Sequence, residues 1–322
     1  MPRICLALLA VLLLARPALA QGRAIERSVR LLIDNDLFAV QSHFPNDHDY
    51  THGTRIVATS SGSPRWMRAL LRRPLECDTA AGRQLGCVAS SLEIAQEIYT
   101  PRVDGTTPVP GERPYSGWLY AAGSAHVISA SRVRSLRLEI GVTGPESLAE
   151  QAQDGVHKFL GERERRGWAH QLGPGVGILA GYDERAIVAH RDSGRSVGSL
   201  ALEYGIVAGN VRTAVHAGLL GRIGIGRGAV WSPVDLATTP RDGVYVLGGV
   251  RQYFVARDLF VEGNAEHPGA ERLPIVQEVV LGAGVRRRRV SLEYRHVLRG
   301  REYEAQRSAH AWGSFALTID QF

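Results

Sequence analysis

The stretch "SLRLEIGVT", residues 135–143, alternates apolar and polar positions without a break. Leu136, Leu138 and Ile140 occupy every second position, and Arg137 and Glu139 lie between them. A period of two predicts a β-strand with one apolar and one polar face. The two faces of this strand must therefore meet very different surroundings.

The same alternation recurs along most of the chain. We expect strand-like segments at 27–37, 51–60, 88–100, 115–129, 132–144, 176–190, 197–208, 211–224, 242–256, 258–264, 274–286, 288–299 and 309–322. Many run for about ten to fourteen residues, longer than the usual five or six and suited to a tilted membrane crossing. Bacterial single-chain barrels have an even number of strands, so we expect the shortest segment, 258–264, not to be one. The prediction is an all-β fold, a transmembrane antiparallel up-and-down β-barrel of about twelve strands.

A soluble β-sandwich would alternate too, and after residue 20 no apolar stretch has the length of a transmembrane helix. The length of the segments and the charges on their inner faces favour the barrel. The chain ends in Phe322, and a terminal aromatic residue is typical of such barrels. Phe315, Leu317 and Ile319 alternate on the other parity. Either the last strand bulges or the terminal residue is less informative than it looks.

The first twenty residues read as an export signal, with Arg3 ahead of an apolar stretch at 6–14 and a small-x-small cleavage site at 18–20. We therefore expect a signal peptide at 1–20 and one barrel domain at 21–322, starting at Gln21. Loss of Arg3 and Arg16 would lower the formal net charge from +6 to +4. Export argues against a nucleic-acid partner. An anionic membrane surface or a phosphorylated lipid fits the basic charge better.

Removal of the signal would also remove Cys5 and leave Cys77 and Cys87, close together in a polar stretch. In an oxidising compartment this spacing predicts one local disulfide. A metal site would need further ligands nearby, and none are present.

Two segments break the strand pattern. Residues 65–73, "RWMRALLRR", are predicted to form a short basic amphipathic helix that lies against lipid head groups or covers a barrel end. Residues 144–168 are predicted to contain a second helix in an extracellular loop, starting near Pro145 and ending at Gly161. Gln153 and His157 are four residues apart and so share one helix face.

Five polar motifs occur in a fixed order: "DNDLF" (34–38), "DYTHG" (49–53), "AQEIYTP" (95–101), "ERPYSGWLY" (112–120) and "GPESLAEQAQDGVHKFLG" (144–161). In this order they resemble the outer-membrane lipid A 3′-O-deacylase family. That resemblance implies a twelve-stranded barrel and calcium-dependent hydrolysis of the ester-linked acyl chain at the 3′ position of lipid A. It also implies a site near the outer rim, between the wall and a loop helix.

The positions that match the family's functional residues are Asn35, Asp36, Thr51, Gln153 and His157. The resemblance implies Ca²⁺ as the cofactor, with Asp36, Asn35 and Thr51 as candidate ligands. Asn35, Asp36, Gln153 and His157 are the candidate catalytic residues, and Thr51 is also a candidate substrate-binding residue. We expect lipid A or lipopolysaccharide as the substrate and a monomer in the outer membrane.

This sequence departs from the family pattern at three points. Asp34 stands where the family more often has Glu, and His52 stands where it usually has Asn. The family's site lysine has no counterpart that we can place, because Lys158 is the only lysine in the chain. These departures bear on specificity more than on fold.

The chemistry of these residue types agrees with ester hydrolysis. A histidine can take a proton from water, and a hard cation held by carboxylate and amide oxygens can polarise a carbonyl. Asn35 and Asp36 are adjacent, and adjacent strand residues point to opposite faces. Both can serve one site only if the strand bends there or a ligand comes from the backbone.

Each candidate has a structural alternative. Asp36 could be a turn residue, His157 a surface histidine and Thr51 an ordinary strand residue. Arg113 and Trp118 are candidate substrate-binding residues for lipid phosphate and acyl chain, or a rim arginine and an interfacial aromatic residue. His43, His48 and His52 with Asp47 and Asp49 could hold a metal, although a solvated acidic loop is favoured. Ser116 as a nucleophile lacks the spacing of a serine triad.

Three functions compete. The first is the lipid A esterase. The second is a catalytically silent structural or pore-type barrel. The third is an esterase that acts on another acyl ester, such as a phospholipid, through a serine nucleophile. The pair of Gln153 and His157 favours the first over the second.

Overall fold

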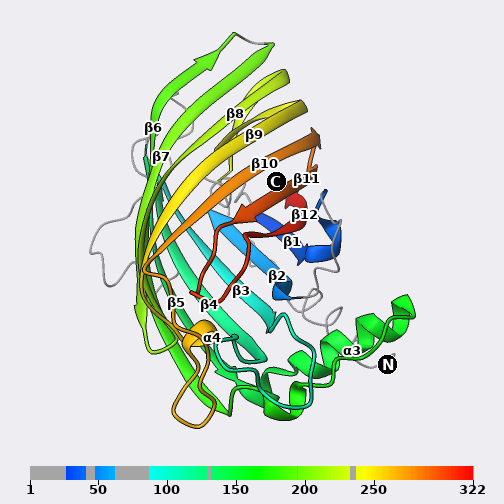
Figure 1. Cartoon of the computed structure of the whole chain (residues 1–322). Helices are drawn as coiled ribbons and strands as arrows, with labels where there is room; N and C mark the ends of the chain where they lie inside the picture. The colour runs from blue at the N-terminus through cyan, green and yellow to red at the C-terminus, as the bar shows by residue number, and fades with distance from the viewer. Residues whose placement is uncertain are drawn as a thin grey trace, which may run out of the picture.

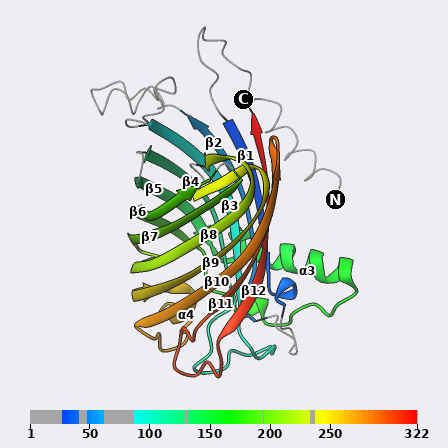
Figure 2. The same ribbon diagram turned by 90° about the horizontal axis from the view of Figure 1, so that it is seen from above.

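The computed structural model describes residues 27–40, 48–61, 87–128, 132–193, 195–232 and 237–321. Within them the chain forms a closed antiparallel barrel of twelve strands, each paired with its neighbours in sequence, and β1 pairs with β12 (Figures 1 and 2). The strands are β1 (Arg27–Asn35), β2 (Asp49–Ser61), β3 (Cys87–Thr100), β4 (Ser116–Ile128), β5 (Arg132–Thr143), β6 (Gly175–Asp192), β7 (Ser196–Gly209), β8 (Arg212–Ser232), β9 (Ala237–Asp258), β10 (Ile275–Arg287), β11 (Val290–Arg299) and β12 (His310–Gln321).

Twelve of the thirteen predicted segments overlap these strands, and the expected exception is confirmed. Residues 258–264 contain a one-turn helix, α4 (Leu259–Glu262), which is capped by the side chain of Asp258. β8 and β9 continue well past the predicted ends at 224 and 242. Glycine and proline interrupt the alternation there while the backbone pairing continues, for example between Ala229 and Pro240.

The outer surface of the barrel is apolar, as the alternation predicted. On β5, Leu136, Leu138 and Ile140 are 62%, 50% and 52% exposed. Large aliphatic side chains are exposed in the same way on most other strands. A surface of this kind is stable against hydrocarbon but not against water, which excludes the soluble sandwich. No helix among the described residues is long and apolar enough to cross a bilayer.

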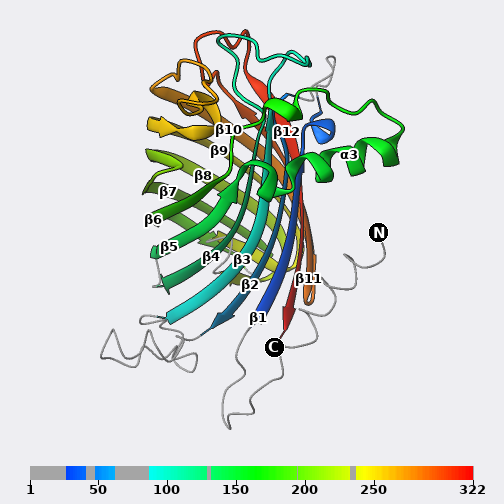
Figure 3. The ribbon, with the colours of Figure 1, turned by 90° about the horizontal axis from the view of Figure 1, so that it is seen from below.

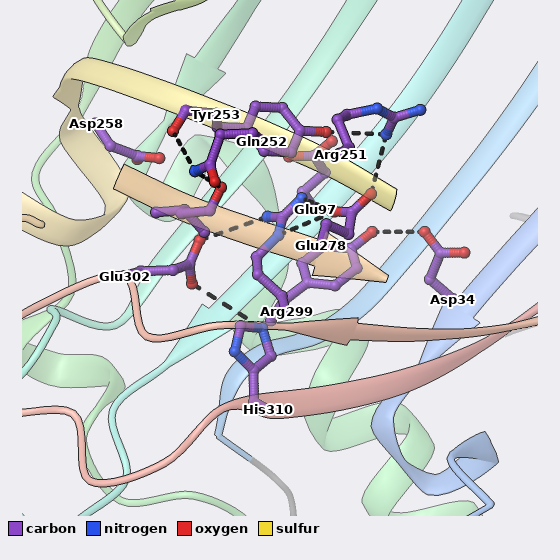
Figure 4. Close-up of polar contacts among 12 residues, drawn as sticks. Asp34, Glu97, Arg251, Gln252, Tyr253, Asp258, Glu278, Arg299, Glu302 and His310 are labelled. Carbon is purple, nitrogen blue, oxygen red and sulfur yellow. Dashed lines mark hydrogen bonds and ion pairs between the residues drawn. The ribbon is translucent and has the colours of Figure 1, made fainter. Parts of the chain in front are cut away.

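The interior is polar, and its charges are paired. Glu293 accepts from Arg30 and from Arg222, at 3.4 and 3.2 Å. Glu278 does the same for Arg251 and Arg299, at 2.9 and 2.6 Å (Figure 4). Because removal of one partner would leave a buried charge alone, each pair is costly to break, by about 3–5 kcal/mol.

Aromatic side chains fill the interior near the end with the long loops. Trp118 stacks on Tyr120 with ring centroids 5.7 Å apart, and Phe260 stacks on Tyr99 at 4.7 Å. Tyr50 belongs to the same buried cluster. In outer-membrane barrels the long loops lie on the extracellular side. Aromatic side chains therefore fill the extracellular end of the barrel interior.

The longest of these loops crosses the outside of the wall and carries α3 (Ala149–Leu160), which Figure 3 shows beside β1 to β3. A short 3₁₀ turn, η2 (Gly144–Ser147), precedes it, so the helix begins a few residues later than predicted. It ends as predicted at Gly161, whose φ of 73° suits glycine. Gly117 on β4 lets the loop approach, because a Cβ there would lie 2.1 Å from Ser147 Oγ and 2.3 Å from Ala149 Cβ.

Several sequence predictions fall outside the described residues. They are the signal peptide at 1–20, the helix at 65–73, Cys77, and Phe322. The disulfide between Cys77 and Cys87 stays a prediction for the same reason. At the end of β12, Phe315, Leu317 and Ile319 are exposed on one face as predicted.

Substitution of Gly117 by alanine should loosen α3 from the wall without opening the barrel. The added methyl group would overpack this contact at a cost of roughly 1–3 kcal/mol. Tryptic cleavage in the loop, at Lys158 or Arg163, should become about ten- to a hundredfold faster, since cleavage follows the open population. Heat-modifiable migration of the barrel in detergent gels should stay unchanged.

The matched control is Gly123→Ala on the same face of β4, where the nearest atom to an added Cβ lies 4.0 Å away. It should leave the cleavage rate at the wild-type level. Equal cleavage rates for Gly117→Ala and wild type would show that this glycine does not set the helix position.

Candidate active site

The chain turns sharply at the end of β1. This turn explains how two adjacent candidate residues, Asn35 and Asp36, can face the same pocket. Asp34 points into the barrel and accepts from the Tyr50 hydroxyl at 2.8 Å. Asn35 ends the strand, and Asp36 begins a 3₁₀ turn, η1 (Asp36–Phe38). The Asn35 side chain caps that turn, since its Oδ1 accepts from the backbone N–H of Leu37 at 2.8 Å. The turn replaces strand alternation, so Asn35 and Asp36 line the same pocket.

A β-bulge on β2 places Thr51 and His52 side by side in the same pocket. The pairing of β2 with β3 shifts between Tyr50 and His52, and Thr51 is left without a partner in the ladder. Bulges re-aim side chains in this way beside functional sites. Thr51 is 2% exposed, its hydroxyl donates to the carbonyl of Ile98 at 3.2 Å, and it lines the pocket together with His52.

The other wall of the pocket is α3, whose buried face holds Gln153 and His157 as predicted. Trp168 donates from its indole Nε1 to Gln153 Oε1 at 2.9 Å, and its ring is 5.1 Å from that of Tyr115 on the barrel side. Trp168, Tyr115, Ile98 and Ala149 form one buried cluster, which holds the helix to the wall.

The hydrogen bond of His157 fixes its tautomer. Its Nδ1 lies 2.7 Å from the carbonyl oxygen of Arg163, and a carbonyl can only accept. Nδ1 therefore carries the hydrogen. In the neutral imidazole the lone pair is then on Nε2. This arrangement suits a proton acceptor, because the other ring nitrogen is held by the backbone.

The pocket between the wall and the helix brings all five residues of the predicted constellation together. Its cavity volume is about 30 Å³, enough for an ion or one or two water molecules. It is lined by Asn35, Asp36, Leu37, Thr51, His52, Ile98, Ala152, Gln153, Val156, His157 and Glu162. Asp36 is 3% exposed, and Gln153 and His157 are each 6% exposed.

Arg113 and Trp118, the predicted substrate-binding residues, lie elsewhere. Trp118 is 1% exposed within the aromatic cluster inside the barrel. Arg113 is buried at the extracellular rim, 2.6 Å from Glu302 and 3.3 Å from Asp49. Burial alone would lower the pKa of Arg113, but the carboxylates of Glu302 and Asp49 outweigh burial and raise it above its usual value. Neither position supports a contact with substrate.

The remaining histidine and serine candidates also have structural partners. His48 pairs with Asp49 at 2.8 Å. Asp49 is 1% exposed, contrary to the expectation of a solvated loop. His43 and Asp47 lie outside the described residues, within which no group of three or more His, Cys, Asp or Glu could hold a metal. Ser116 donates to the carbonyl of Pro114 at 3.2 Å and not to a base.

Two polar residues outside the predicted constellation of five also line the pocket. His52 faces Asn35 across the β1–β2 pairing, and Glu162 follows the C-terminal cap of α3. The strand register would have indicated His52, because its cross-strand partner is a predicted site residue. Nothing in the sequence pattern indicates Glu162.

Comparison with known proteins identifies a family and structures of similar fold. The family model "Outer membrane protein LpxR" matches residues 6–320. The solved structure of LpxR from Salmonella typhimurium superposes with a TM-score of 0.74 at 18% identity, over 91% of this chain and 99% of that one. The β-domain of the Bordetella autotransporter BrkA matches over 92% of this chain and 99% of that one, at 11% identity with a TM-score of 0.46. No curated protein sequence gives a significant match.

The family model spans nearly all of the chain, and the solved LpxR structure from Salmonella typhimurium shares the fold of this chain. The chain therefore belongs to the LpxR family of outer membrane proteins.

Proposed function

We propose that this protein is an outer-membrane esterase that removes the 3′-linked acyl chain or chains from lipid A. The observation that carries the proposal is the pocket outside the barrel wall. There the oxygen-bearing side chains of Asn35, Asp36 and Thr51 face the Gln153 and His157 pair of α3. The LpxR family model supports the same conclusion.

The surroundings of the pocket suit a substrate that resides in the membrane. Leu37 and Val156 line the pocket and are 47% and 38% exposed. Phe159, on the outer side of the same helix, is 88% exposed. Apolar side chains on a loop helix outside a barrel wall meet the boundary between head groups and acyl chains. A lipid can therefore reach the pocket from the side.

The donor set of the pocket fits a calcium ion. Asp36 offers a carboxylate, Asn35 an amide oxygen and Thr51 a hydroxyl, and calcium prefers such hard oxygen ligands. These three supply fewer than the six to eight oxygens that calcium takes, so water or substrate oxygens would complete the shell. When bound, the ion would polarise the ester carbonyl.

His157 would act as the general base. Its Nε2 takes a proton from a water molecule as the water oxygen attacks the ester carbonyl carbon. The bond between that carbon and the sugar oxygen then breaks. The proton held on Nε2 passes to the leaving sugar oxygen, which gives a free fatty acid and a hydroxyl on lipid A. Gln153, held by Trp168, would orient the water or the substrate.

The competing functions have less support from the described residues. Paired charges and aromatic rings occupy the barrel interior, which opposes a pore. A serine nucleophile would need a base within reach, and the Ser116 hydroxyl donates to a backbone carbonyl instead.

Expression of the protein in a host that lacks such an enzyme should change the mass of its lipid A. We expect loss of the mass of the 3′-linked acyl group or groups by mass spectrometry, with the phosphates retained. An unchanged spectrum from cells that contain folded barrel in the outer membrane would contradict the esterase. Loss of a different acyl group would show that the enzyme hydrolyses an ester at another position of lipid A.

Asp36→Asn should weaken calcium binding and turnover together. The substitution keeps the size of the side chain but removes the charge, and a carboxylate is the strongest ligand in this set. The calcium concentration for half-maximal activity should rise, and excess chelator should abolish activity of the wild type. Glu266→Gln, which changes an exposed carboxylate in the loop after α4, is the charge-matched control. Full activity in excess chelator would remove the ion from the mechanism.

His157→Gln should lower turnover by roughly a hundred- to ten-thousandfold, the usual contribution of a general base. Folding should be spared, because the residue lies on a loop helix and not in the barrel wall. Fatty-acid release from lipid A in detergent, with calcium present, is the measurement. His170→Gln in the same loop, at an exposed position, should have no effect. A near wild-type rate for His157→Gln would place the base elsewhere.

A further inference from the structure

We infer that His52 is a positioning residue that locks the side chain of Asn35, and through it the turn that presents Asp36 to the pocket. The inference rests on the proposed function for its effect on turnover. The hydrogen-bond arrangement that carries it is a property of the structure alone. In this role His52 acts on the end of β1 through Asn35.

The orientation of the Asn35 amide is the first step. Oδ1 accepts from the N–H of Leu37 at 2.8 Å, and a backbone N–H can only donate. The amide is thereby fixed with its NH₂ group on the other side. That group, Nδ2, lies 3.3 Å from Nδ1 of His52. Because the amide NH₂ can only donate, Nδ1 of His52 must be the acceptor and carries no hydrogen.

The second ring nitrogen of His52 has a partner that agrees with this tautomer. Nε2 lies 2.8 Å from the Thr54 hydroxyl oxygen, which can accept. A neutral His52 therefore carries its hydrogen on Nε2 and donates it to Thr54. This is the opposite tautomer to that of His157, in which Nδ1 carries the hydrogen. With Nδ1 engaged by Asn35, His52 is poorly placed to serve as a general base.

The strand register explains why His52 has this role. His52 is the direct cross-strand partner of Asn35 in the β1–β2 pairing. Side chains of such a pair stand on the same face of the sheet, with Cβ atoms about 4.5–5.5 Å apart. Since Asn35 is the last residue of β1, its partner is the nearest wall residue that can hold the cap of η1.

The turn itself needs external support. It is only three residues long, and so short a 3₁₀ turn has poor hydrogen-bond geometry of its own. At its far end the carbonyl of Phe38 accepts from the Tyr294 hydroxyl at 2.7 Å, and the Phe38 ring meets that of Phe315 at 5.2 Å. At its near end the link from His52 to Asn35 is the matching anchor. Asp36 lies between the two.

A pair of substitutions separates the two hydrogen bonds of His52. His52→Asn keeps an acceptor near the position of Nδ1, because both atoms are attached to Cγ. His52→Gln reaches toward Thr54 but places no acceptor at that position. We expect kcat within about threefold of wild type for His52→Asn. For His52→Gln we expect kcat to fall about tenfold with little change in KM, the scale of one net hydrogen bond.

A measurement without substrate tests the same inference. In nitrogen NMR of ¹⁵N-histidine-labelled protein in detergent micelles, the ring signal that disappears in His52→Asn should show hydrogen on Nε2 and none on Nδ1. The His157 signal, identified by its loss in His157→Gln, should show the reverse. The barrel fold of each variant is checked by heat-modifiable migration.

Three results would overturn the inference. They are a hydrogen on Nδ1 of His52, a folded His52→Asn variant as slow as His52→Gln, and a His52→Gln variant at the wild-type rate. Failure of the proposed function would look different. Wild-type protein would then release no fatty acid from lipid A, while the NMR signal of His52 would still decide whether it holds Asn35.

Discussion

The contact between α3 and the outside of the barrel wall forms the pocket that is the candidate site. The strands supply Asn35 and Thr51, the turn η1 supplies Asp36, and the helix supplies Gln153 and His157. A helix of twelve residues with an internal glycine is not stable on its own in water. It is ordered because the loop buries Trp168 against the wall, and the same indole orients Gln153. One side chain thus links the packing of the loop to the geometry of the pocket.

Local patterns were enough to predict most of the fold. Period two predicted the strands. The even-number rule required one segment fewer, and short length correctly singled out 258–264, where Asp258 caps a helical turn instead. The helix face of Gln153 and His157 was also readable, because four residues make about one turn. Each of these features depends on residues close in sequence. Because these local features could be predicted from the sequence, the predicted barrel and the observed barrel are the same.

The sequence says least where the partners of a residue are distant along the chain. From the sequence alone Arg113 could be a substrate contact or a rim arginine, because its partners, Asp49 and Glu302, lie far from it along the chain. Trp118 shares the inward parity of Tyr120, but the pattern alone could not say which face of β4 lies inside near the rim. The bulge at Thr51 and the pairing of His52 with Asn35 follow from strand register, which a single sequence does not specify.

Because the pocket lies outside the wall, the relevant concentration of a membrane ligand is its density in the bilayer. A ligand that lies in the bilayer approaches by diffusion in two dimensions, and its supply is a surface density of lipid. Its acyl chains need not pass through bulk water on the way, so the free energy of extraction from the bilayer does not enter the encounter. Affinity measured against dispersed molecules in solution would therefore describe a different equilibrium from the one at the barrel wall.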